Sequence, residues 1–345
     1  MSVMQIGFFS EDNRLEKLSK LGDTLERLNS VINWEQFRPI LKKATQKEHK
    51  GLGGRPPYDV ILMVKIMILQ RLYNLSDDQM EFQINDRISF MRFLGLGLGD
   101  SVPDAKTIWL FRDTLTKADV MDKLFHNFNK MLLDAGIITR EGTIVDATFV
   151  DAPRQRNRRD ENASIKDGNV PEEWKKPENA HKLSQKDTDA RWTIKNNERH
   201  YGYKDHVKVD ADSKIITGYT VTSANVHDSQ ALVELITEED QKLYADSAYV
   251  GEELHKQLPK NVEIKIHEKG YREHPLTEEE KENNRKKSKI RARVEHVFGF
   301  MTGSMHGITV RSIGMQRAKF NIGLTNLVYN ICRYEILKRP KFSKG

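Results

Sequence analysis

The hydrophobic period of this chain changes at Thr143, and that change restricts the fold more than any other feature. Before it, apolar residues recur at three- and four-residue intervals, the period of amphipathic helices. From Thr143 the segment TIVDATFV is short, β-branched and apolar, as expected for a buried strand. Strands and helices then alternate. The pattern predicts an all-α domain over residues 1–138, a mixed α/β domain over residues 139–337 and a basic tail at residues 338–345.

The first domain should have an apolar helix over residues 58–73 at its centre. Before it, five aliphatic residues at spacings of three and four predict one helix with a narrow apolar seam. They are Leu18, Leu21, Leu25, Leu28 and Ile32. Two heptads leave open whether this helix packs in the core or forms a dimer zipper.

Two further helices are expected, and the second has a basic outer face. Ser76 should cap the first, and the second should begin at Asp104. On the second, Lys106, Thr107 and Arg112 should stay outside, where they could contact DNA. The connection exceeds the usual three or four residues, so a helix-turn-helix reader and a plain helical bundle both stay open.

A polar segment over residues 153–189 interrupts the α/β domain. It has almost no aliphatic residues, so it should be a surface insertion without a core, or a loop ordered by a partner. Strand character returns in HYGYKDHVKVD and IITGYTVTSAN, with ADSK as a hairpin turn between them. Trp192, just before this hairpin, is either a base-stacking residue or a buried residue of an edge strand.

Three carboxylates lie where an uncompensated charge would be costly. Asp146 interrupts a core strand, Asp246 lies at the carboxyl end of another, and Glu295 borders the apolar stripe of a helix expected over residues 285–303. A shared hard dication would satisfy all three, since magnesium prefers oxygen ligands. Two ions about 4 Å apart would suit phosphoryl transfer.

Positive charge gathers near the C-terminus. The chain has a formal net charge of +6, yet residues 281–345 hold fifteen Lys or Arg against three acidic residues. This predicts binding to a polyanion, with a merely solvated basic surface as the alternative. Arg291 lies one turn before Glu295 and should either pair with it or contact phosphate. Lys289 and Arg293, on the far side of the helix, should face DNA backbone or solvent.

Other classes of protein are disfavoured. The single cysteine, Cys332, excludes an intrachain disulfide and a thiolate metal site, which fits a reducing cytoplasm. The apolar run VILMVKIMIL contains Lys65 and is shorter than the roughly 20 residues of a membrane span, so no membrane contact is expected. The glycines of LGLGLG follow no strand, so they do not form a dinucleotide-binding loop.

The stretches TIVDATFV, DARWTIKNNERHYGYKDHVKVD, TSANVHDS, YADSAY and RARVEHVFG occur in this order. Together they resemble bacterial insertion-sequence transposases of the DDE type, whose N-terminal helical region the first domain also resembles. The resemblance implies a ribonuclease-H-like catalytic domain in which Asp146, Asp246 and Glu295 are the catalytic and metal-binding triad. It further implies two Mg²⁺ ions, with Mn²⁺ as a substitute, and a bacterial cytoplasmic protein associated with the nucleoid.

The resemblance also implies an activity. Such a protein would bind the terminal inverted repeats of an insertion sequence, cut the DNA there and join it to target DNA. Synapsis of two ends implies a homodimer or a larger assembly. The alternatives are a catalytically inactive repressor that occupies element ends, and a related metal-dependent nuclease that cuts without joining.

Four positions qualify the resemblance. Ser288 stands where the family usually has tyrosine, and Thr302 stands where it usually has lysine, so the DNA contacts of those two side chains are not expected here. Asp151 and Asp228 are further acidic residues near the same motifs. We expect Asp151 to be a loop residue after its strand, and Asp228 to cap the following helix or to bind metal.

Overall fold

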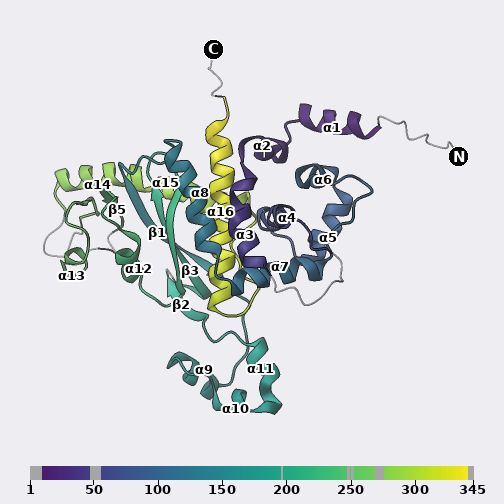
Figure 1. Cartoon of the computed structure of the whole chain (residues 1–345). Coiled ribbons are helices and arrows are strands. Elements are labelled where there is room, and N and C mark those ends of the chain that lie inside the picture. Colours follow the sequence, from purple (N-terminus) through teal and green to yellow (C-terminus); the bar gives the residue numbers. More distant parts are fainter. Residues whose placement is uncertain are drawn as a thin grey trace. The chain divides into compact units, whose positions relative to one another are not determined.

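The structure, a computed structural model, describes residues 10–46, 56–195, 197–246, 249, 252–268 and 276–340. It divides into two compact units, Met1–Asn127 with Ile331–Gly345, and Phe128–Asn330. Figure 1 shows that helices α8 (Met121–Asp134) and α16 (Met315–Lys338) are continuous through these limits. The sequence placed the domain limits at residues 138 and 337, close to the ends of these two helices. A limit inside a continuous helix leaves the hydrophobic period unchanged, so the sequence pattern does not mark it.

The first unit consists of helices in its described residues. They are α1 (Ser10–Lys20), α2 (Thr24–Val31), η1 (Trp34–Phe37), α3 (Arg38–Thr45), α4 (Val60–Leu72), α5 (Asp77–Asp86), α6 (Ile88–Leu94) and α7 (Ala105–Lys117). As expected, α4 is buried on most sides. Ser76 and Gln79 form a reciprocal capping box at the start of α5, which satisfies amides that the helix leaves unpaired.

The apolar residues up to Ile32 were expected to lie on one helix, but they are divided between α1 and α2. Gly22 has a left-handed φ of 85°, which glycine adopts without strain, and the Asp23 carboxylate accepts a hydrogen bond from the Leu25 amide to begin α2. Leu21 is 84% exposed, whereas Leu25 and Leu28 are buried. The prediction of one seamed helix was therefore wrong, because the glycine and the capping aspartate outweigh the hydrophobic spacing.

The second unit contains a six-stranded mixed sheet. Its strands are β1 (Thr143–Asp151), β2 (Arg191–Lys195), β3 (Glu198–Asp210), β4 (Ile216–Ser223), β5 (Lys242–Tyr244) and β6 (Glu263–Ile264). Strand β3 pairs antiparallel with β1, β2 and β4, while β5 pairs parallel with β1, and β6 with β5. The order β4-β3-β1-β5-β6, three antiparallel strands and then two parallel ones, is the ribonuclease-H-like arrangement that was expected.

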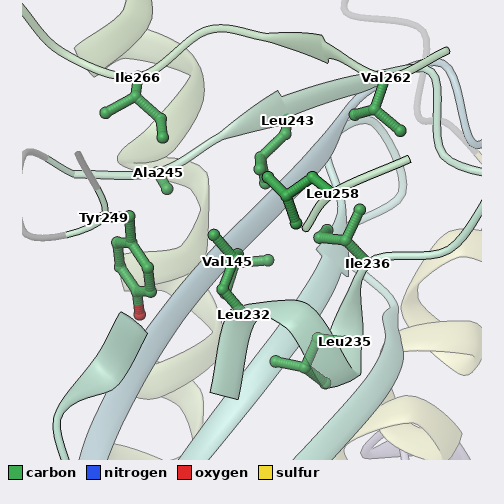
Figure 2. Close-up of a cluster of buried hydrophobic side chains, with 10 residues drawn as sticks. All are labelled: Val145, Leu232, Leu235, Ile236, Leu243, Ala245, Tyr249, Leu258, Val262 and Ile266. Atoms are coloured by element: carbon green, nitrogen blue, oxygen red, sulfur yellow. The ribbon is translucent and has the colours of Figure 1, made fainter. Parts of the chain in front are cut away.

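A core of ten buried side chains holds β1 and β5 together (Figure 2). Leu232 and Leu235 of α12 (Asp228–Leu235) pack there against Val145 of β1 and Leu243 of β5. The other members are Ile236, Ala245, Tyr249, Leu258, Val262 and Ile266. By the area rule each large aliphatic residue contributes about 1.5–3 kcal/mol, so this core fixes the end of β1 that carries Asp146 against β5.

The helix expected over residues 285–303 is divided at Ala292 into α14 (Glu278–Arg291) and α15 (Arg293–Gly303). At the division the Glu295 amide donates to the Ala292 carbonyl, 3.2 Å away, which tightens the turn to a three-residue step. Val294, Val297 and Met301 are buried, so the apolar stripe lies where it was expected. A short helix, α13 (Glu252–Lys256), precedes this pair.

The insertion over residues 153–189 folds into short helices next to β2 (Figure 1). They are α9 (Arg159–Lys166), α10 (Glu172–Lys175), η2 (Pro177–Asn179) and α11 (Ala180–Gln185). Trp174 is 0% exposed, and its indole Nε1 donates to Glu161 at 2.8 Å. The expectation that this segment lacks a core was wrong, since one tryptophan with a satisfied N–H buries the area of several aliphatic residues.

Replacement of Trp174 by alanine should open the insertion, because it removes the side chain at the centre of that small core. We expect a loss of about 3–5 kcal/mol in local stability. Limited proteolysis within residues 153–189 should become much faster. Leu183→Ala is the control, since Leu183 is a large apolar residue of the same insertion that is exposed. Equal protease resistance in both variants would contradict the prediction.

Candidate active site

Strands β1 and β5 bring Asp146 and Asp246 to the same level of the sheet. Their parallel register pairs Thr143 with Leu243 and Ile144 with Tyr244. The same offset, continued past the end of β5, places Asp246 level with Asp146. Burial raises the pKa of the Asp146 carboxyl, and the negative charge of Asp246 raises it further. Two carboxylates that disfavour each other's charge in this way suit a shared cation.

Arg291, the last residue of α14, supplies a positive charge to this pair. Its Nη1 donates to Oδ2 of Asp146 at 3.4 Å, and its charge lowers the pKa of the Asp146 carboxyl against the effect of burial. The Nε of Arg291 is buried and has no hydrogen-bond partner among the described residues. Arg291 therefore pairs across the fold with Asp146, and because its side chain is 28% exposed, the guanidinium can also donate to a further acceptor such as a phosphate oxygen.

Glu295 is exposed on α15, although it was expected to face the edge of the core. Helix α15 packs against β1, so Glu295 belongs to an element next to Asp146. Within the part of the chain that the structure describes, no group of three His, Cys, Asp or Glu side chains lies close enough to hold a metal ion. The donor set of Asp146 and Asp246 fits a hard cation. The structure does not bring Glu295 to them.

Tyr249 is a site residue that was not predicted from the sequence. It is 1% exposed, and its hydroxyl is buried without a hydrogen-bond partner among the described residues. Burial raises the pKa of the Tyr249 hydroxyl, as do the charges of Asp228, Asp146 and Asp246. Figure 2 shows the ring at the margin of the apolar core, with its hydroxyl directed away from Ala245. The Tyr249 hydroxyl is thus a neutral O–H donor near three carboxylates. In the sequence, the tyrosine that ends YADSAY is the feature that could have indicated this residue.

Asp228 lies beside the same site but does not cap its helix as expected. The cap of α12 is His227, whose ring nitrogen accepts from the Ser229 amide. Asp228 instead accepts from the Lys204 ammonium at 2.8 Å, and its Oδ1 lies 4.0 Å from Nδ1 of His206. Burial lowers the pKa of the His206 imidazole to about 4, so this ring is neutral at physiological pH.

Three residues of the second unit that were expected to contact DNA have different surroundings. Arg293 donates to the Ala211 carbonyl at 2.7 Å and to Asp212 at 3.0 Å, which ties α15 to the turn after β3. Lys289 is exposed on α14. Trp192 is 49% exposed, so the buried alternative was wrong. Its ring tilts against Tyr201, with the two centroids 5.0 Å apart.

The three predicted DNA contacts of the first unit also differ from one another. Lys106 is exposed at the start of α7. The Thr107 amide donates to the capping carboxylate of Asp104 at 2.6 Å. Arg112 makes two hydrogen bonds of 2.7 Å to Asp77, so it joins α7 to α5 instead of facing outward. In the sequence, α6 and the residues after it lie between α5 and α7, so the connection is longer than the usual three or four residues of a helix-turn-helix.

Asp151, expected in a loop, is the last residue of β1 and is exposed. Its carbonyl accepts from the Val310 amide at 2.9 Å, which extends the pairing beyond the strand. The carboxylate of Asp151 therefore belongs to the strand end.

The sequence profile described as Transposase DDE domain matches residues 138–331, which include Asp146, Asp246, Arg291 and Glu295. The chain belongs to this transposase family. A second profile, Transposase domain (DUF772), matches residues 13–114 of the helical unit. Both halves of the chain thus match transposases, and the order of motifs that suggested this family is confirmed.

A solved structure, the cryo-EM structure of the piggyBac transposase synaptic complex with hairpin DNA, is similar to this transposase-family chain at 11% identity. The TM-score is 0.41, and the match covers 90% of this chain and 72% of that chain. A likeness at this level says nothing about function. In the described residues, no helix is both long and apolar enough to cross a membrane.

Asp205 is a fully buried carboxyl on the face of β3 opposite Lys204 and His206. Its Oδ1 accepts from the Asn326 side-chain amide at 3.1 Å, and its Oδ2 is buried without a partner in the described part of the chain. Burial raises the pKa of the Asp205 carboxyl to about 7. Asp205 is therefore largely protonated below neutral pH.

The stability of the protein should depend on pH through Asp205. Between the unfolded pKa of 3.8 and the folded pKa of about 7, the folded state holds a proton that the unfolded chain has lost. The free energy of unfolding contributed by Asp205 is therefore largest below the unfolded pKa and falls as pH rises through this window. Asp205→Asn does not titrate. Denaturant unfolding at about pH 5 and pH 8 should show the wild type losing stability relative to Asp205→Asn, and a constant difference would contradict the assignment.

Proposed function

We propose that this protein is a DNA transposase that cuts the terminal inverted repeats of an insertion sequence and joins them to target DNA. In this proposal Asp146, Asp246 and Glu295 hold two divalent metal ions, Mg²⁺ or Mn²⁺ in its place. The observation that carries the proposal is the partly buried carboxylate of Asp146, level with Asp246 and paired with Arg291. Membership of the transposase family supports it.

The protein side chains have separate tasks in this site. When bound, the metal ions would favour ionisation of the attacking water and stabilise charge on the phosphate. Asp146 and Asp246 supply anionic oxygen ligands from the sheet, and Glu295 supplies one from α15. Arg291, whose side chain is partly exposed, donates from its guanidinium to an oxygen of the scissile phosphate.

The reaction proceeds in two balanced steps. In the first, a water oxygen forms a bond to phosphorus at the element end, the bond from phosphorus to the 3′ oxygen breaks, and that oxygen leaves as a hydroxyl after taking up a proton. In the second, this 3′ hydroxyl attacks a phosphorus of target DNA and displaces a target 3′ hydroxyl. Phosphoryl transfer requires mainly positioning and charge stabilisation, so no covalent enzyme intermediate is needed.

DNA binding would involve both units. Lys106 and Thr107 on the helical unit, and Lys289 with the basic tail, carry positive or polar groups suited to phosphate. Arg112 and Arg293 would act indirectly, because both already bind protein acceptors. Two element ends held together require at least a homodimer.

Substitution of the proposed triad should abolish cleavage without loss of DNA binding. A plasmid that carries the element with its flanks, incubated with protein and Mg²⁺ or Mn²⁺, should be nicked by wild type. Asp146→Asn, Asp246→Asn and Glu295→Gln should each slow nicking by a factor on the order of 10³ or more, because each removes an anionic oxygen ligand.

Asp151→Asn is the matched control, since Asp151 is a carboxylate of the same strand outside the site, and it should cut like wild type. An Asp146→Asn variant that cuts as fast as wild type would show the triad to be wrong. Cutting without joined product would favour the nuclease alternative. Wild-type protein that binds the ends and never nicks them would favour the repressor.

A further inference from the structure

The insertion begins with four arginines in six residues, Arg154, Arg156, Arg158 and Arg159. We call residues 154–159 the arginine segment. It follows β1 directly, and all four arginines are exposed. No acidic residue lies within the segment. It is therefore a strongly positive surface close in sequence and in space to the strand that carries Asp146.

Exposure alternates along the arginine segment, as in an extended chain with two faces. The arginines at 154, 156 and 158 are exposed, while Gln155 and Asn157 between them are partly buried. Gln155 exchanges two hydrogen bonds with the Asp187 backbone, at 2.7 and 2.8 Å. Asn157 accepts from the Lys186 ammonium at 2.9 Å. The inner face thus fixes the backbone, and the outer face presents guanidinium groups.

Two acidic residues of the insertion pair with lysines and not with these arginines. Glu172 pairs with Lys175 at 2.5 Å, and Glu173 pairs with Lys176 at 2.6 Å. Within the described ranges, none of the four guanidinium groups of the arginine segment forms an ion pair with an acidic side chain. The insertion therefore pairs its lysines internally and leaves its arginines available.

Folding stability does not explain where two of these arginines lie. Arg158 and Arg159 lie at the start of α9, where the helix dipole is positive and a cation costs about 0.3–1 kcal/mol. The Arg154 guanidinium lies 5.4 Å from the centroid of the Trp192 ring, so the segment continues to an exposed aromatic residue. A polyanion such as a DNA backbone would satisfy these arginines.

We propose that the arginine segment, together with Trp192, binds the phosphate backbone of double-stranded DNA beside the catalytic strand. This inference rests on the proposed function and names a contact surface for its substrate. In an extended chain, alternate residues are spaced by about 6.6 Å, while one DNA strand presents a phosphate for each 3.4 Å of rise. Neighbouring guanidiniums can therefore reach different phosphates, and each offers the planar fork that binds phosphate in two hydrogen bonds.

The test measures how DNA binding depends on salt. The quadruple variant Arg154→Gln, Arg156→Gln, Arg158→Gln, Arg159→Gln is compared with the control Lys166→Gln, Lys175→Gln, Lys176→Gln, Lys182→Gln, which removes equal charge from the same insertion. The probe is a fluorescently labelled duplex that carries an element end, titrated at graded salt. Each lost phosphate contact lowers the slope of log K against log salt by about 0.9, so the arginine variant should lose about 3.6. The lysine control should keep most of the wild-type slope.

Single substitutions control for the possibility that the quadruple variant misfolds α9. Arg154→Gln and Arg156→Gln lie outside the helix and should each lower the slope by about 0.9. Replacement of the four arginines by lysine should keep most of the slope, since the charge is retained.

Two results would separate the two proposals. Unchanged slopes in the single and quadruple arginine variants would overturn the inference about the segment, while nicking by wild type would leave the proposed function intact. Wild-type protein that neither binds nor nicks the duplex would defeat the proposed function itself.

Discussion

The antiparallel pairing of β1 with β3 over nine residues is the contact on which the second unit depends. Its register runs from Thr143 opposite Asp210 to Asp151 opposite Gly202. At Gly202 a Cβ atom would lie 2.2 Å from the Val150 carbonyl oxygen, so only glycine allows the strands to approach at that end. This explains the glycine of HYGYKDHVKVD in physical terms. A residue with a side chain there would force apart the strand that carries Asp146.

The same register divides the polar residues of β3 between two faces. Lys204 and His206 lie on the face of α12, where they meet Asp228, and Asp205 lies on the opposite face against Asn326 of α16. Because a shift of one residue would exchange these faces, the charged pair on one side and the buried neutral carboxyl on the other both depend on the pairing. Asp228 on the first face raises the pKa of the Tyr249 hydroxyl together with Asp146 and Asp246, while the opposite face packs against α16.

Sequence reasoning could place the elements because their signals are local. The strand around Asp146, the hairpin turn at residues 211–214 and the stripe of Val294, Val297 and Met301 all follow from period and turn chemistry. The partner of Arg291 could not be predicted, since Asp146 is distant in sequence and only the closed fold brings the two within 3.4 Å. The same holds for Tyr249, whose place among three carboxylates depends on the core in Figure 2.

The insertion over residues 153–189 shows how one residue can overturn a prediction that a segment has no core. A count of aliphatic residues predicts no core, yet Trp174 is enclosed by short helices and Asp187 fixes them to the sheet. Asp187 accepts from the Tyr203 hydroxyl of β3 at 2.7 Å and from the Gly314 amide at 3.2 Å, while its backbone pairs with Gln155. The beginning of the arginine segment is thus held in place, by β1 before it and by Asp187 through Gln155. These bonds also fix where the first arginines lie relative to β1, the strand that carries Asp146.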